Sequence, residues 1–402
     1  MLYSGYIRQP NIALPDEIIA LPNPINAEVA LDGNKPIVKS GMTVVVGDPL
    51  TDGEIPVFSP ITGTVVSVSD SSVQLSLGLS ERKICCDPVT KGITEISKKE
   101  IISCIRSHGL RLTGCVPCAE KLESCTGKVK KVIIAGFDDE NCKGINNFLV
   151  NHRLSAVING ARILAKAVGC GMLVLLLDRK NSRRKRLAHE IANKSHIVHP
   201  RFDPIRYPMS NSDYLIKVMY DETHLKGESV LDLGYAVFTA EACVNIYEAL
   251  RFGYSSTDKL INVYDGKSLR IARVPLGSSA GYILRYLGVQ VGENTVICRR
   301  SMINPEIIDA GYRVTDSDDL IFTASAHAPV ALPCISCGRC TAVCPAGISP
   351  VETALGKSFG PIKHAPADDC IRCNLCSSLC PAGIDLMSGV TAKSEAPEDS
   401  EK

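Results

Sequence analysis

The sequence predicts a multidomain protein of mixed α+β and α/β class, and three observations support this fold class. A length of 402 residues suggests about two to four domains, at roughly 150 residues each. Strand-like runs broken by Gly and Pro fill the first 80 residues, whereas strands and helices alternate in the middle of the chain. Eight of the 18 cysteines fall between Cys334 and Cys380, which indicates a separate C-terminal domain.

The charge balance and the apolar runs exclude several function classes. The chain carries 44 basic and 43 acidic side chains, so bulk charge does not point to nucleic acid or to an anionic membrane surface. The longest apolar run, Val168 to Leu177, is about half of the roughly 20 residues that a membrane-spanning helix requires. The first residues lack the features of a secretory signal. We therefore expect a cytoplasmic protein without a membrane span, for which peripheral membrane association stays open.

Residues 1–80 are predicted to form a β-rich module that resembles the barrel-sandwich domain of lipoyl carriers. Its strand-like runs extend from Val38 to Leu50 and from Val57 to Val68, and Gly and Pro interrupt both. Thr62 and Gly63 stand where a carrier would present its modified lysine. We therefore expect a structural or docking role for this module.

Residues 81–230 are predicted to form a Rossmann-like α/β core. A capping box from Ser97 to Glu100 begins a helix, and the apolar run from Val132 to Gly136 indicates a buried strand. A helix over Ile158–Val168 and a strand over Met172–Leu177 follow. Strands that alternate with helices indicate a parallel sheet.

The remainder of the chain is predicted to form two further domains and a tail. Residues 231–328 are predicted to form a small β-grasp (SLBB-like) domain, because a strand begins at Lys259 and a turn after Val274 leads into a short helix. Residues 329–390 contain the crowded cysteines and are predicted to form a ferredoxin-like domain with two clusters. The charged residues 391–402 are predicted to be a disordered tail.

The eight C-terminal cysteines form two copies of the pattern C-x2-C-x2-C-x3-C-P, which is the bacterial two-cluster ferredoxin run. In that run the fourth cysteine of each copy binds the cluster of the other copy. Zinc is the alternative, because four thiolates also suit a tetrahedral zinc ion. The duplicated spacing favours two [4Fe-4S] clusters, the first on Cys334, Cys337, Cys340 and Cys380 and the second on Cys370, Cys373, Cys376 and Cys344.

The order of these domains resembles that of the RnfC family, whose members belong to the Rnf electron-transport complex, and, more distantly, that of the flavin subunit of respiratory complex I. Besides the cluster motifs, the resemblance is carried by Lys99–Gly109, Ile205–Pro208 and Cys243–Leu250. It covers nearly all of residues 30–388. It implies that this RnfC-like chain transfers electrons to a partner oxidoreductase or to a membrane electron-transport complex.

Only some residues of the flavin and nucleotide site that the resemblance implies are present in this sequence. In the family, a segment reading G-G-A-G-F-P-T cradles FMN while NADH stacks above it. Here the equivalent stretch is Leu112–Cys118, with Lys121 at the position of the family's lysine. Asp138 and Glu140 remain from an acidic segment, and Glu241 replaces a glycine. Side chains at positions of close approach obstruct a phosphate-bearing cofactor, so FMN is an alternative rather than the expected cofactor.

Cys115 and Cys118 form a C-x2-C pair at the place where the flavin would react. Such a pair can be a redox dithiol whose lower-pKa member attacks disulfides. The same cysteines could also be metal ligands or inert buried residues. All three interpretations stay open on the sequence.

The expected function is electron transfer between a reduced donor and a partner oxidoreductase, with Cys115 and Cys118 as a further redox centre. In lacking a complete flavin motif, the sequence resembles the electron-transfer protein associated with D-proline reductase. This reductase is therefore one candidate partner. The alternative is an FMN-dependent, NADH-oxidising subunit of an Rnf-type complex or a cobalamin reductase. A third hypothesis is a docking subunit whose clusters only connect two partners.

Overall fold

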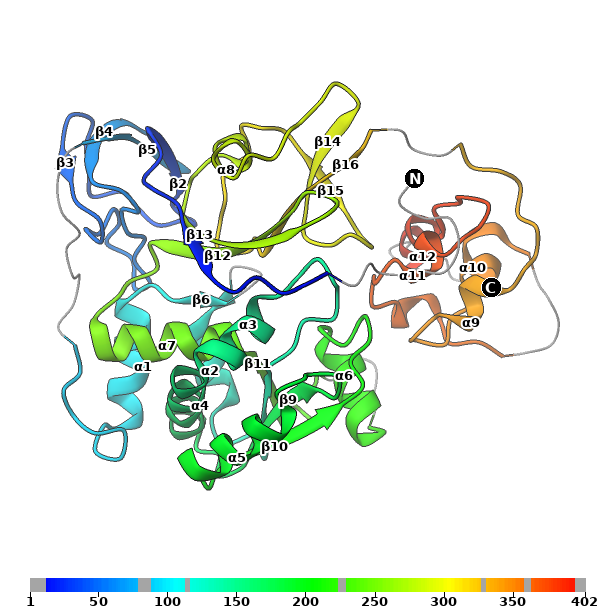
Figure 1. Ribbon diagram of the computed structural model, residues 1–402, viewed down its shortest axis with the longest axis horizontal. Helices are drawn as coiled ribbons and strands as arrows, with labels where there is room; N and C mark the ends of the chain where they lie inside the picture. Colours follow the sequence, from blue (N-terminus) through cyan, green and yellow to red (C-terminus); the bar gives the residue numbers. More distant parts are fainter. Residues whose placement is uncertain are drawn as a thin grey trace, which may run out of the picture.

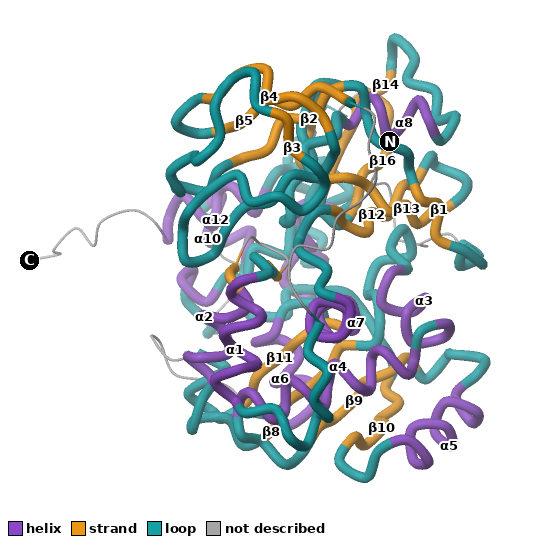
Figure 2. The backbone as a smooth tube through the Cα atoms, turned by 90° about the vertical axis from the view of Figure 1, so that its left-hand side faces the viewer, coloured by secondary structure: helices purple, strands orange, loops and turns teal. Residues whose placement is uncertain are grey.

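The structure is a computed structural model that describes residues 12–78, 88–112, 116–222, 229–326, 330–357 and 363–394. Two β-rich parts lie side by side above a helix-covered sheet, and the cysteine-rich segment lies beside them (Figure 1). Figure 2 shows the same division, with the β-rich parts in the upper half of the view and most helices in the lower half. The fold is therefore of mixed α/β class, as predicted.

The first sheet belongs to the N-terminal module and is antiparallel, in the strand order β2-β5-β4-β3. Alternate apolar residues such as Val29, Val65 and Val73 turn inward to form its core. A Cβ atom at Gly63 would lie 1.8 Å from the carbonyl oxygen of Ser76, so only glycine permits this strand pairing. The strands are β2 (Asn26–Ala30), β3 (Thr43–Val44), β4 (Gly63–Val68) and β5 (Ser72–Leu77).

The second sheet is parallel, in the order β10-β9-β8-β11, which confirms the predicted parallel arrangement. Helices α1 to α5 and α7 contribute to the apolar cluster on one face, and α6 contributes to the cluster on the other face. Ser97 and Glu100 form the predicted capping box at the start of α1. The elements are α1 (Lys98–Ser107), α2 (Cys118–Cys125), β8 (Lys131–Ala135), α3 (Ile145–His152), α4 (Leu154–Val168), β9 (Leu173–Asp178), α5 (Arg184–Lys194), β10 (Val198–Asp203), α6 (Ser212–Tyr220), β11 (Tyr235–Thr239) and α7 (Ala240–Phe252).

Helices α4 and α7 make a close crossing beneath this sheet. A Cβ atom at Gly160 of α4 would lie 1.9 Å from the carbonyl oxygen of Cys243 in α7. The absence of a side chain at Gly160 therefore lets the two helix backbones approach. This crossing holds the first turn of α7, and with it Glu241, close to the end of β11.

The third sheet is mixed, in the order β1-β13-β12-β16-β14-β15. Its first strand comes from the N-terminal part of the chain, since Ile18–Ala20 pairs in parallel with Ile271–Arg273. The sequence had placed all of residues 1–80 in one module, and this long-range pairing has no local signal. The elements are β1 (Ile18–Ala20), β12 (Asp258–Tyr264), β13 (Leu269–Pro275), α8 (Ala280–Tyr286), β14 (Thr295–Arg299), β15 (Glu306–Ile308) and β16 (Leu320–Ser325).

The cysteine-rich segment contains only short helices, because its chain turns repeatedly around the cysteines. Its last helix continues to Ser394, four residues into the predicted disordered tail, and the rest of that tail lies outside the described residues. None of the helices in the described ranges has the length and apolar character that a bilayer crossing requires. The elements are α9 (Arg339–Ala342), α10 (Pro350–Leu355), η1 (Ala367–Asp369), α11 (Leu375–Ser378) and α12 (Leu386–Ser394), and a short ribbon of β6 (Arg111–Leu112) and β7 (Val116–Pro117) precedes α2 in the core.

Candidate functional site

Four cysteines from both sequence runs line one cavity in the C-terminal segment. The cavity encloses about 370 Å³, and its remaining wall includes the apolar side chains of Val351 and Leu386. The backbone amide of Ser336 donates to the Cys334 sulfur at 3.4 Å, which is the kind of contact that stabilises a thiolate. We call these cysteines the first thiol set: Cys334, Cys337, Cys340 and Cys380.

A second group of cysteines lies together beside the first. Burial raises the pKa of Cys373 to about 11, and Cys344 and Cys370 are near enough to raise it further. Burial likewise raises the pKa of Cys376 to about 12, with smaller contributions from Cys373 and Cys370. These groups would lose their protons on binding a metal centre, because thiolate is the form that coordinates. We call them the second thiol set: Cys344, Cys370, Cys373 and Cys376.

The arrangement differs from that of a site for a single metal ion. In the described ranges, which include all eight of these cysteines, no group of three or more Cys, His, Asp or Glu side chains is arranged to hold a single metal ion. Tetrahedral zinc requires four donors at about 2.3 Å from one centre. An iron-sulfur cluster is instead held at its corners by thiolates that stand apart. The grouping thus suits two clusters, each with three cysteines from one run and the fourth from the other.

The second thiol set faces the core and the loop between β14 and β15, and three hydrogen bonds hold its own loops there. The Tyr207 hydroxyl donates to the carbonyl oxygen of Cys373 at 2.8 Å. Lys217 of α6 donates to the carbonyl oxygen of Pro345 at 3.3 Å, and the Asn374 amide donates to that of Ile303 at 2.7 Å. The described residues that line the cavity of the first thiol set all belong to the C-terminal segment. The second set is therefore the one next to the core.

A cavity of about 1130 Å³, open to solvent, lies at the carboxyl ends of β8 and β11, where parallel sheets commonly bind ligands. Lys121 lines it, donates to the carbonyl oxygen of Val237 at 2.8 Å and lies 4.6 Å from the centre of the Phe238 ring. Burial lowers the pKa of Lys121. Asn262 and Asp319 of the third sheet complete the wall.

Asp138 and Glu140, two residues apart, have different surroundings. Asp138 lines the cavity and accepts the backbone amides of Asn146 and Asn147, so its carboxylate already occupies the N-terminus of α3. Glu140 lies outside the cavity lining and accepts from the Ser301 hydroxyl at 2.9 Å and the Met302 amide at 2.8 Å. Burial raises the pKa of both carboxyls. Glu140 thus joins the core to the third sheet.

Glu241, which stands where the RnfC family has a glycine, forms a buried ion pair with Lys259 of β12. The two charged groups are 2.9 Å apart. Both side chains are less than a tenth exposed. The neighbouring Lys143 pairs with Asp319 at 2.9 Å and with Glu140 at 3.3 Å. The charged groups around this cavity are therefore held by partners within the chain, either by ion pairs or by hydrogen bonds to the backbone.

The described lining does not fit the phosphate of FMN or the pyrophosphate of NADH. It contains four carboxylates, and its two lysines, Lys121 and Lys143, already have partners within the chain. A phosphate dianion would meet repulsion there rather than the donors that such groups require. Thr113, Gly114 and Cys115 lie outside the described residues.

The surroundings of Cys118 are apolar. Its side chain is 1% exposed, and desolvation raises its pKa to about 12, although Lys121 acts in the opposite direction. Reactive cysteines have a lowered pKa and some exposure. Because Cys115 is not described, the Cys115/Cys118 dithiol stays a prediction.

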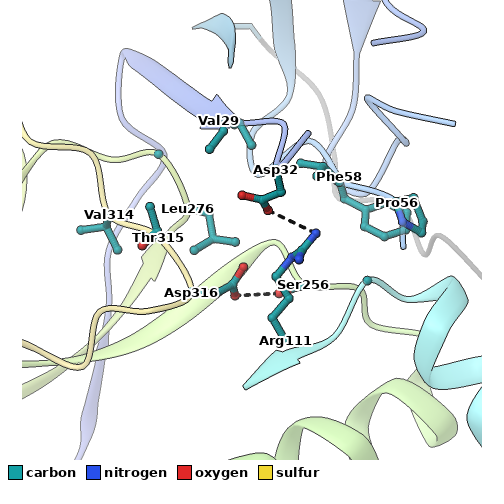
Figure 3. Close-up of a pocket in the computed structure, with 14 residues that line it drawn as sticks. Val29, Asp32, Pro56, Phe58, Arg111, Ser256, Leu276, Val314, Thr315 and Asp316 are labelled. Carbon is teal, nitrogen blue, oxygen red and sulfur yellow. Dashed lines mark hydrogen bonds and ion pairs between the residues drawn. The ribbon is translucent and has the colours of Figure 1, made fainter. Parts of the chain in front are cut away.

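A second cavity of about 460 Å³ lies where the N-terminal module, the core and the third sheet meet (Figure 3). Arg111 extends from β6 into it and pairs with Asp32 at 3.2 Å. In the same cavity the Ser256 hydroxyl donates to Asp316 at 3.0 Å. Desolvation raises the pKa of Asp316 to about 6. These two polar contacts lie at the junction of the N-terminal module, the core and the third sheet.

Comparison with known proteins gives two family matches. Residues 105–248 match the Nuo51 FMN-binding domain, and residues 333–385 match the 4Fe-4S dicluster domain. The second match covers both thiol sets, and the first covers the cavity residues of the core.

Curated relatives extend this similarity over most of the chain, and those named here are RnfC subunits of ion-translocating oxidoreductase complexes. The RnfC protein of Buchnera aphidicola (subspecies Baizongia pistaciae) is 23% identical over 85% of this chain and 71% of its own length. That of Actinobacillus succinogenes is 23% identical over 82% of this chain and 50% of its own length. The resemblance to RnfC is confirmed. The chain spans only 43% of the RnfC protein from Haemophilus influenzae, at 24% identity.

Solved structures of an NAD+-reducing [NiFe]-hydrogenase are also similar in part. The H2-reduced form covers 60% of this chain with a TM-score of 0.47 and 13% identity. The air-oxidized form covers 64% with a TM-score of 0.49 and 14% identity.

The sequence did not single out Tyr207, Lys217 or Asn374, which fasten the second thiol set to the core. Tyr207 was noted only as part of the segment Ile205–Pro208 that carries the family resemblance. Its partner Cys373 lies 166 residues away. No local pattern reports such a contact.

Proposed function

We propose that this protein is an electron-transfer subunit that holds two [4Fe-4S] clusters and serves a partner oxidoreductase. The observation that carries the proposal is the grouping of eight cysteines into two sets, each completed by a cysteine from the other run. When bound, each cluster would accept and release one electron. The confirmed resemblance to the RnfC proteins of ion-translocating complexes supports the same function.

The chain's own residues would supply three things to this function. The thiols would hold the clusters, and apolar walls such as Val351 and Leu386 would exclude water from the first one. The bonds from Tyr207 and Lys217 would fix the second thiol set against the core.

An exposed apolar surface beside the first thiol set is a suitable place for the partner. Val330, Leu332 and Ile335 are 87%, 61% and 66% exposed, and they flank Cys334 and Cys337. Exposed apolar groups that cluster in this way commonly mark interaction sites. We place the partner's redox centre here. The partner is either a membrane electron-transport complex, on whose cytoplasmic side the protein would bind peripherally, or a soluble enzyme such as D-proline reductase.

Reductive titration of anaerobically purified protein tests the proposal. We expect about eight irons and eight sulfides per chain and the uptake of two electrons from dithionite, one for each cluster. Zinc in place of iron, or no electron uptake, would contradict it. Replacing Val330 and Leu332, which do not line the cavity of the first thiol set, by Ser should slow electron delivery to the partner and leave the iron content unchanged.

A second candidate is an FMN-dependent, NADH-oxidising subunit of an Rnf-type complex or a cobalamin reductase. The match to the Nuo51 FMN-binding domain and the large cavity of the core favour it. The acidic lining and the internal ion pairs oppose it. Bound flavin distinguishes the two candidates.

A further inference from the structure

The two thiol sets differ in how the rest of the protein contacts them. The second set receives hydrogen bonds on two of its loops, at Cys373 and at Pro345, which directly follows Cys344. Both donors come from the core. Among the described residues, those that line the cavity of the first set all belong to the C-terminal segment. The described contacts from core side chains therefore reach the second set and not the first.

Tyr207 makes the most direct of these contacts. Its hydroxyl donates to the carbonyl of a cysteine that belongs to the second thiol set, at 2.8 Å. The positive end of the O–H dipole points toward this ligand loop. Reduction adds negative charge to a cluster, so a nearby positive dipole stabilises the reduced form.

The Tyr207 hydroxyl lies near the Ser301 hydroxyl and the Glu140 carboxylate. Glu140 is itself held by Ser301 and Met302 of the third sheet. The Tyr207 side chain is thus part of a network that joins the core, the third sheet and the second thiol set.

From this geometry we infer that Tyr207 is a positioning residue for the second cluster and raises its reduction potential relative to that of the first. The inference rests on the proposed function, because it requires both clusters to be present. Hydrogen bonds and dipoles close to iron-sulfur clusters are among the features that set their potentials.

The test is a redox titration of full-length, anaerobically prepared protein, followed by electron paramagnetic resonance. In Tyr207→Phe, the equilibrium constant for electron transfer from the second cluster to the first should rise about threefold. This corresponds to a change of about 28 mV in the difference between the two potentials, since a tenfold change is 59 mV. The shift should come from a lower potential of the second cluster. Cys337→Ala, which removes a ligand of the first thiol set only, identifies which signal belongs to which cluster.

Tyr282→Phe is the matched control. Its hydroxyl also donates to a backbone carbonyl, that of Pro22, away from both thiol sets. This variant should leave both potentials unchanged. An equal shift of both potentials in Tyr207→Phe, or no shift of either, would overturn the inference.

Lys217→Gln covers the case in which Tyr207→Phe loses iron. This variant removes a positive charge beside Pro345 without touching the Tyr207 contact. It should also lower the potential of the second cluster alone, and no change in it would overturn the inference. If the unaltered chain itself holds far fewer than eight irons, the proposed function fails. Eight irons with no selective shift in the variants would contradict only the role of Tyr207.

Discussion

The C-terminal segment and the cavity of the core both occupy places suited to a cofactor, but their polar groups are arranged in opposite ways. In the C-terminal segment, cysteines from two separate runs line shared space. In the core, carboxylates and lysines pair with one another, as Glu241 does with Lys259. The thiols of the first region are available to bind a cluster, whereas the charged groups of the second region already have partners within the chain. A retained fold therefore does not imply a retained binding site.

The largest expected effect concerns the shared ligands of the thiol sets. Cys344→Ala should reduce the iron content from about eight to about four per chain, because the fourth cysteine of the first run completes the second cluster. Iron and sulfide assays measure this loss, and electron paramagnetic resonance shows which cluster remains. Cys337→Ala should remove the other cluster. Loss of the same signal in both variants would contradict the exchange of the fourth cysteines.

A large loss of stability is expected when the buried pair of the core is broken. Glu241→Ala leaves Lys259 charged and buried, which should lower the free energy of unfolding by about 3–5 kcal/mol. Denaturant unfolding under anaerobic conditions measures it.

Glu190→Ala is the control for this prediction, because it breaks a solvent-exposed pair with Arg186 and should cost far less stability than Glu241→Ala. The double variant with Glu241→Leu and Lys259→Met should recover most of the loss. If Glu241→Ala and Glu190→Ala lower the free energy of unfolding equally, the pair of Glu241 and Lys259 is accessible to water, and the prediction of a buried pair is wrong.

A smaller, pH-dependent effect is expected at the junction in Figure 3. The pKa of Asp316 is raised from 3.8 to about 6, so the folded protein binds this proton more tightly than the unfolded chain does. The resulting stability is fully present below about pH 3.8 and is lost as pH rises through about 6. Asp316→Asn should therefore be about 2–3 kcal/mol more stable than the unaltered chain at pH 7 and close to it at pH 4. A difference that is constant between these pH values would rule out the raised pKa.

The smallest expected effect is on the reactivity of Cys118. At pH 8, a thiol whose pKa is about 12 is almost entirely protonated, so iodoacetamide should not label Cys118 in the folded protein. Mass spectrometry of peptides from folded and unfolded protein measures the labelling. Rapid labelling in the folded state would instead support the Cys115/Cys118 dithiol.

Local sequence was sufficient to recognise the two cysteine runs, because their spacing matches the two-cluster ferredoxin pattern, in which the fourth cysteine of each run joins the other set. It was also sufficient for the capping box at Ser97 and for the alternation that predicts the parallel sheet. It could not give the contact between Tyr207 and Cys373 or the pairing of β1 with β13, which join residues far apart in the chain. Asp138 and Glu140 illustrate the same limit, since neighbours in sequence face a cavity in one case and the third sheet in the other.

Three measurements on one anaerobically purified sample compare the two regions most directly. They are the flavin content after extraction, the iron content, and the absorption spectrum before and after addition of NADH. We predict about eight irons per chain, no flavin and no bleaching by NADH. One FMN per chain together with rapid bleaching would show that the core cavity still binds its cofactor. The protein would then be an NADH-oxidising subunit, and the proposal of a flavin-free electron carrier would be wrong.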